Sequence, residues 1–231
     1  MHEARAIDGR SLVRRRAGLR LWLSAGWLGL LCVVALFAPW IAPKDPLAQD
    51  LFLGRLPPFW MAGAEPGYWL GTDSLGRDVL SRIIHGARVA LAVALIAGTI
   101  TCLVGATLGL LAGFLRGWVD MVISRLIDIW MAFPPVLFSI LLIAVLGPGL
   151  WSIIIAIVVI DWTRFARVVR AEAMAQGAMD YVASARVAGR GRLGTMVREI
   201  LPNVLPTIVV LLTLEMGIAV IVERSEEHTS E

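Results

Sequence analysis

The sequence predicts an all-α fold, that of a polytopic helical membrane protein with five membrane-spanning helices. Hydrophobic residues make up 58% of the 231 residues and charged residues only 17%, whereas a soluble domain usually carries about a quarter charged residues. The apolar residues fall into runs of about 20, which is the length that an α-helix needs to cross a hydrocarbon core. The charged residues are concentrated between these runs.

The apolar runs divide the chain in order. We expect spans at residues 19–41, 89–115, 126–146, 150 to about 168 and about 204–222. The first run is too long for the apolar region of a signal peptide, and no small-residue cleavage site follows it. It is therefore interpreted as a retained span after an arginine-rich leader at residues 1–18. The other four spans form a transmembrane core at residues 89–222.

The distribution of arginine predicts the orientation of the spans. Six arginines lie at the amino-terminal end, and seven lie from Arg164 to Arg198, at the end of the fourth span and in the segment that follows it. The turn at 147–149 has no charge, and the loop at 42–88 balances five basic residues with five acidic ones. Because cytoplasmic loops carry an excess of Lys and Arg, the amino terminus is expected in the cytoplasm. The loop at 42–88 is then extracytoplasmic and ends in a juxtamembrane helix capped by Asp73 or Ser74.

Small residues repeat every four positions along the second span, at Gly105, Gly109 and Gly113. Such a spacing lets two helices approach closely inside a membrane. Packing within the chain is the simpler interpretation, and a subunit interface is the alternative.

Two adjacent prolines, Pro134 and Pro135, interrupt the third span. They remove two backbone donors and therefore predict a kink. Such a kink either serves packing alone or forms part of the wall of a translocation pathway, where water reaches the freed carbonyls.

Three carboxylates lie in or at the ends of spans: Asp128, Asp161 and Glu215. Ionisable groups in spans normally face the bundle interior or an aqueous path. The spacing of three residues predicts one ion pair between Asp161 and Arg164 and another between Asp128 and Arg125. Glu215 has no such neighbour in sequence and is interpreted as a pathway residue or a packing contact to a partner subunit. Asp161 is a second pathway or packing candidate.

The segment between the fourth and fifth spans, at about 169–203, predicts a helical hairpin at the cytoplasmic face. Ala, Met and Arg favour a first helix, and Gly189 and Gly191 break it and permit left-handed backbone. The apolar spacing from Leu193 to Ile200 predicts a second, amphipathic helix, which Leu201-Pro202-Asn203 ends. From the residues alone, this hairpin is a surface element anchored by arginines at the lipid headgroups.

Residues 181–203 resemble the EAA loop of ABC-importer permeases. That pattern reads Glu-Ala-Ala, three residues, Gly, nine residues, Ile, one residue and Leu-Pro. Ala183-Ser184-Ala185, Gly189 and Leu201-Pro202 fall in register, but Ala183 replaces the motif glutamate and Glu199 replaces the motif isoleucine. The resemblance implies a coupling helix that seats in a cleft of a cytoplasmic ATPase subunit. The coupling residues would be Tyr181, Ala183, Ser184, Ala185, Arg186, Gly189, Leu201 and Pro202.

Further stretches resemble the C-type subunit of dipeptide, oligopeptide and nickel permeases. They are "LGTDSLGRDVLSRIIHGARVAL" at 70–91, "AFPPVLF", "VLGPGL" and "REILPN". The resemblance implies a type I ABC importer transmembrane fold in a bacterial inner membrane. It also implies a second homologous permease subunit, two cytoplasmic ATPase subunits and an extracytoplasmic solute-binding protein. ATP would be used by the ATPase, and this chain would bind no cofactor; peptide, nickel or another small solute would be transported.

The carboxy-terminal residues 224–231 do not follow this resemblance. Members of the family continue after "VIVE" with a Ser-Leu-Ser-Phe-Leu-Gly-like stretch and a sixth span. Here the octapeptide "RSEEHTSE" resembles the translation of a sequencing-library adapter. We therefore expect a non-native tail and a sixth span lost by truncation.

Other function classes are disfavoured by the sequence. The three histidines are scattered, and no His-Glu-x-x-His, Gly-x-Ser-x-Gly or phosphate-loop motif is present, so an intramembrane enzyme or a metal site is not expected. The arginines alternate with spans instead of forming one face, which argues for lipid and against nucleic acid. A proton-coupled secondary transporter is the alternative, because Asp161 and Glu215 would suit it. The EAA-like loop favours the importer, because a self-sufficient carrier needs no ATPase dock.

Overall fold

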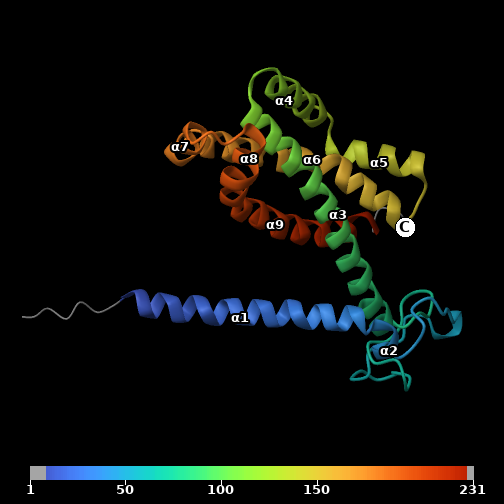
Figure 1. The fold of residues 1–231 in the computed structure, drawn as a ribbon. Helices are drawn as coiled ribbons and strands as arrows, with labels where there is room; N and C mark the ends of the chain where they lie inside the picture. The colour runs from blue at the N-terminus through green and yellow to red at the C-terminus, as the bar shows by residue number, and fades with distance from the viewer. Residues whose placement is uncertain (1–8, 228–231) are drawn as a thin grey trace, which may run out of the picture. The chain divides into compact units, whose positions relative to one another are not determined.

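The computed structural model describes residues 9–227, with side chains described at 18–19 and 22–218. Within this range every regular element is helical (Figure 1), which confirms the all-α prediction. The elements are α1 (Gly9–Leu36), α2 (Ala38–Ile41), η1 (Leu51–Leu53), α3 (Val79–Leu115), α4 (Gly117–Met131), α5 (Pro135–Leu146), α6 (Leu150–Gln176), α7 (Asp180–Val187), α8 (Arg192–Thr195), η2 (Met196–Ile200) and α9 (Leu201–Glu227). Of the expected tail, residues 228–231 lie outside the described part of the chain, as do residues 1–8 of the leader.

The chain divides into two compact units, residues 1–91 and 92–231, which are described separately below. Helix α3 begins in the first unit and continues through the second.

The loop of the first unit is organised by Asp73. Its Oδ1 accepts hydrogen bonds from the backbone N–H groups of Leu75 (2.9 Å) and Arg77 (3.0 Å), and its Oδ2 pairs with the side chains of Arg77 (2.7 Å) and Arg82. Burial of Asp73 opposes its ionisation, but the bonds from Arg77 and Leu75 outweigh it and lower the pKa of Asp73 to about 2. Asp73 is therefore ionised at neutral pH, and it connects backbone and arginine side chains of this loop.

The residue that caps α3 is Asp78. Its Oδ2 accepts a hydrogen bond of 2.8 Å from the N–H of Ser81, in the first turn of the helix. The prediction that Asp73 or Ser74 caps the helix is wrong, because Asp73 closes the preceding turn and α3 begins only at Val79.

The helices differ in how well they meet the requirements of a membrane span. In the described part of the chain, two helices are long and apolar enough by themselves: Val79–Leu115 and Arg192–Ile218. They contain the second and fifth predicted spans. The first predicted span contributes a shorter apolar helix at Trp22–Leu36, and the fourth lies in α6, whose second half carries several charges.

The third predicted span is a broken pair of helices (Figure 1). α4 ends at Met131 and α5 begins at Pro135, and the two helices are bent by 84° at the break. The kink predicted at Pro134 and Pro135 is confirmed, but the span is two helices instead of one. The reason is that neither proline has an N–H group to donate to the preceding turn. The series of backbone hydrogen bonds of α4 therefore ends before the prolines, and a new series begins in α5.

Helix α3 packs against α6 through its three spaced glycines. A Cβ atom at Gly105 would lie 2.5 Å from the Trp162 carbonyl oxygen, and one at Gly109 would lie 2.5 Å from that of Ala166. A Cβ at Gly113 would meet the Arg170 carbonyl oxygen at the same distance. Since real atoms do not approach so closely, this contact requires the absence of side chains, and the packing lies within the chain.

One apolar cluster joins most helices of the second unit. Its fully buried members come from α6, α7, η2 and α9, with further members from α3; they include Phe165, Val169, Val182, Ile200 and Val204. Removal of such side chains from water stabilises a fold by about 25 cal/mol per Å² of apolar surface. The cluster therefore fixes α7 and η2 to the long helices.

Candidate functional site

The predicted hairpin is present, and it follows directly from the end of α6. That helix continues to Gln176, eight residues beyond the predicted end of the fourth span, and its Ala173 is fully buried. α7 follows at Asp180, with Val182 buried on its inner face. Tyr181 donates a hydrogen bond of 2.8 Å from its hydroxyl to Gln176 Oε1. Only the part of the segment after Gln176 therefore leaves the long helices.

A Schellman turn ends α7. The N–H of Gly189 bonds to the Arg186 carbonyl (3.0 Å), and the N–H of Arg190 bonds to the Ala185 carbonyl (3.1 Å). Gly189 has a φ of +84°, and nothing lies within 4 Å of the place where its Cβ would be. Glycine is thus required here by backbone conformation. Gly191 has a φ of −65° and precedes α8, so its predicted left-handed geometry is wrong.

The second half of the hairpin does not end at Leu201-Pro202-Asn203. Helical backbone runs from α8 through the π-helical turn η2 into α9. Pro202 lacks an N–H, and the wider η2 turn immediately before it relieves the clash that a proline ring makes with an α-helical ladder. Asn203 Nδ2 donates to the Glu199 carbonyl at 2.7 Å, which adds a bond across this turn. The hairpin and the fifth predicted span are therefore one continuous element.

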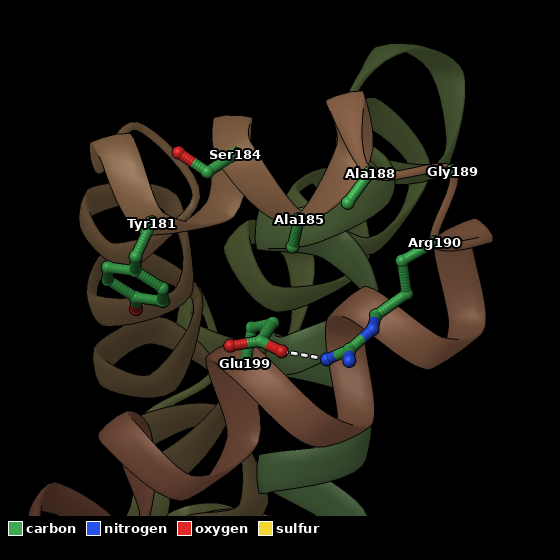
Figure 2. Close-up of a pocket in the computed structure, with 7 residues that line it drawn as sticks. All are labelled: Tyr181, Ser184, Ala185, Ala188, Gly189, Arg190 and Glu199. Carbon is green, nitrogen blue, oxygen red and sulfur yellow. Dashed lines mark hydrogen bonds and ion pairs between the residues drawn. The ribbon is translucent and has the colours of Figure 1, made fainter.

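A cavity of about 490 Å³ lies between the two halves of the hairpin (Figure 2). Ser184 and Ala185 of α7 and Ala188 directly after it line this cavity with small side chains, and Tyr181 and Gly189 lie at its ends. Arg190 extends from the turn and pairs with Glu199 of η2. We call this hollow the hairpin cavity.

Burial, with the neighbouring Glu199 and Glu172 carboxylates, raises the pKa of Tyr181 against a hydrogen bond with Asn203 that lowers it. The phenol consequently stays protonated at neutral pH and keeps its hydrogen bond to Gln176.

Four predicted coupling residues line this cavity: Tyr181, Ser184, Ala185 and Gly189. The other four do not: Ala183 and Pro202 are exposed, Leu201 packs against the apolar cluster, and Arg186 lies over the Phe114 ring at 5.4 Å. The list of coupling residues omitted Ala188, Arg190 and Glu199, which also line it. The opposite charges at Arg190, within the glycine turn, and at Glu199, nine residues later, were a signal that was available in the sequence.

The charged residues of the spans form ion pairs between helices. Arg164 of α6 lies 3.2 Å from Glu215 of α9 and 3.8 Å from Asp161. The predicted pair of Asp161 with Arg164 is thus present, and Glu215, with 2% of its surface exposed, gains a partner 51 residues away. Asp128 pairs with Arg167 of α6 at 3.7 Å. Its predicted pairing with Arg125 is wrong, because α4 packs against α6 and brings Asp128 to that helix.

Two family models match the chain. The model of binding-protein-dependent transport system inner membrane components covers residues 105–222, and that of the N-terminal transmembrane domain of oligopeptide transport permease C covers residues 20–58. The first match contains the hairpin, α6 and most of α9.

Curated relatives are similar over most of the chain. The di/tripeptide transport system permease protein DppC of Pseudomonas aeruginosa is 40% identical over 231 residues, covering 96% of this chain and 76% of the relative. The dipeptide transport system permease protein DppC of Haemophilus influenzae is 40% identical, covering 83% and 65%. The glutathione transport system permease protein GsiD of Pectobacterium atrosepticum is 36% identical, covering 85% and 64%. The chain thus spans about two thirds to three quarters of these relatives' lengths. It belongs to the family of inner-membrane components of binding-protein-dependent transport systems.

Proposed function

We propose that this chain is a permease subunit of an ATP-driven importer of peptides, and that its hairpin docks the ATPase. The observation that carries the proposal is the hairpin itself. A Schellman turn connects its two halves, and an ion pair holds that turn to η2. Val182 and Ile200 bury its inner face in the apolar cluster. A dock that transmits force must be rigid, and these contacts make it so.

The hairpin is connected to two long helices without flexible linkers. α6 leads into it through the short turn at residues 177–179, and η2 continues directly into α9. Movement of the hairpin by an ATPase would therefore displace α6 and α9 together. This displacement would alternate the access of the pathway, with the energy supplied by ATP hydrolysis on a separate subunit.

The assembly implied by the family adds three kinds of partner. A second, related permease would complete the pore, two ATPase subunits would face the cytoplasm and a solute-binding protein would deliver peptide from outside. In this arrangement the amino terminus and the hairpin are cytoplasmic, because they carry the arginine excess. The loop held by Asp73 then faces the binding protein. The names of the relatives support di- and tripeptides as the solute class.

Filling the hairpin cavity tests the proposal. Ala185→Trp should reduce co-purification of the ATPase subunits at least tenfold, because the bulky ring occupies the space that the ATPase needs. Val145→Trp is the matched control, since Val145 is 75% exposed on α5 and lies away from the cavity. Undiminished co-purification with the Ala185 variant would reject the cavity as the dock.

A further inference from the structure

A second cavity, of about 260 Å³, lies at the break between α4 and α5. It is lined by the aromatic rings of Trp130, Phe133 and Phe138 and by α6, including Asp161, Arg164 and Arg167. We call it the break cavity. Charged groups inside a predicted span are costly unless they are paired or face water, so charges and rings together at a helix break call for an explanation.

The charges of the break cavity are arranged as a dipole. Arg164 lies against both Glu215 (3.2 Å) and Asp161 (3.8 Å), so one cation faces two carboxylates. Carboxyl groups therefore outnumber cations at the Asp161 end. At the other end Arg167 is more than half exposed, and its contact with the equally exposed Asp128 is long, at 3.7 Å. The two ends of the cavity therefore favour opposite charges.

The start of α5 completes the lining of the break cavity. Pro135 and Phe138 line it, and no side chain caps that helix. Pro135 has no N–H group, and the N–H of Phe138 bonds to the Pro134 carbonyl (3.1 Å). A carboxylate in the break cavity would accordingly find its charged donor in Arg167.

The spacing of the two ends is on the scale of a short peptide. Asp161 and Arg167 are six residues apart on one helix, which is about 9 Å along its axis, and a dipeptide in extended form spans about 7 Å between its ends. Aromatic rings between the ends offer apolar surface to the peptide side chains, as ligand pockets commonly do.

We propose that the break cavity is a transient binding site for the charged termini of a peptide during transport. The peptide ammonium group faces Asp161, the carboxylate faces Arg167, and the side chains lie against Phe133 and Phe138. An anionic lipid headgroup is disfavoured, because the three carboxylates in or beside the cavity outnumber the two arginines. This inference rests on the proposed peptide-import function and adds to it a site within the permease.

The test uses the assembled complex in lipid nanodiscs, with p-benzoylphenylalanine in place of Phe133, which is 55% exposed. The probe is radiolabelled Ala-Phe at millimolar concentration, without the binding protein, so that only the membrane complex is examined. We expect light-dependent labelling of this chain. Asp161→Asn and Arg167→Gln should each lower it about tenfold, and Arg125→Gln, on the exposed surface of α4, should leave it unchanged. Excess N-acetyl-Ala-Phe-amide, which lacks both charges, should fail to compete.

The inference would be overturned by absent labelling, by labelling that neither Asp161→Asn nor Arg167→Gln reduces, or by capture of phospholipid in place of the peptide. Each complex is also checked for ATPase crosslinking from Ser184 in the hairpin. Crosslinking without peptide labelling rejects the break cavity alone, whereas failure of crosslinking in the wild-type background rejects the proposed function. Equal crosslinking in the charge variants shows that they still fold and assemble.

Discussion

Arg190 and Glu199 form an ion pair across the hairpin cavity, joining the turn after α7 to the π-helical turn before α9. Glu199 stands at the position of the motif isoleucine, and the motif glutamate is absent because Ala183 occupies its place. The pair therefore holds the hairpin closed by charge where the motif has an apolar residue.

Breaking this pair should impair coupling more than stability. Both side chains are partly exposed, at 39% and 25%, and exposed pairs contribute less than about 1 kcal/mol. Glu199→Gln should leave the melting temperature within a few degrees of wild type but lower peptide uptake per ATP hydrolysed by about twofold to fivefold. Uptake and ATPase rates in proteoliposomes measure this ratio. The charge swap Arg190→Glu with Glu199→Arg should restore part of it; a double variant worse than either single one would argue against the pair.

Gly189 should tolerate no β-branched residue. Its φ of +84° is strained for any side chain and most of all for valine. Gly189→Val should distort the Schellman turn and uncouple ATP hydrolysis from uptake, while Gly191→Ala, at a φ of −65°, should retain coupling. The two variants are compared in the same vesicles. Equal uptake would mean that the shape of the turn does not matter.

A side chain added at one of the α3 glycines that contact α6 should destabilise the fold. Gly109→Ala places a Cβ 2.5 Å from a backbone oxygen, and overpacking of this kind costs about 1–3 kcal/mol. Gly86→Ala, on the same helix with nothing within 4 Å, is the control and should be neutral or stabilising. Thermal unfolding of the purified complex distinguishes them, and similar melting temperatures would contradict the close contact.

The stabilisation that ionised Asp73 gives to its loop should be lost only in acid. Because the folded pKa of Asp73 is about 2 and the unfolded value is about 3.9, its contribution is complete above about pH 5 and disappears as pH falls through about 2. Asp73→Asn should therefore speed proteolysis of residues 42–78 at pH 7, and the difference from wild type should shrink between about pH 4 and pH 2. Glu65→Gln, on the exposed surface, is the control. A difference that grows on acidification would contradict this role of Asp73.

Patterns of local sequence predicted much of the fold. Apolar runs located the spans, two prolines located the break of the third span, and glycine located the hairpin turn. These features follow from properties of single residues or of neighbours along the helix. The resemblance to the EAA loop implied the register of the hairpin residues, and four of the eight coupling residues it implied line the hairpin cavity.

The features that sequence reasoning missed depend on distant contacts. Glu215 and Arg164 are 51 residues apart, and Asp128 meets Arg167 only because α4 folds against α6. The continuity of η2 with α9 was missed because Pro202 usually interrupts a helix, whereas here a π-helical turn accommodates it. The 84° angle at the α4–α5 break was likewise not predicted, because two prolines specify an interruption of the helix but not its angle.

The central claim is that the hairpin is held by a separate ATPase, and photocrosslinking from Ser184 tests it most directly. A photoreactive residue at Ser184, exposed on α7, should capture the ATPase subunit in intact membranes, whereas the same residue at Ser139 of α5 should not. ATP should change the yield at Ser184 as the complex turns over. Absence of any ATPase adduct from Ser184, or labelling of that position by a membrane-impermeant reagent added outside the cell, would contradict the account.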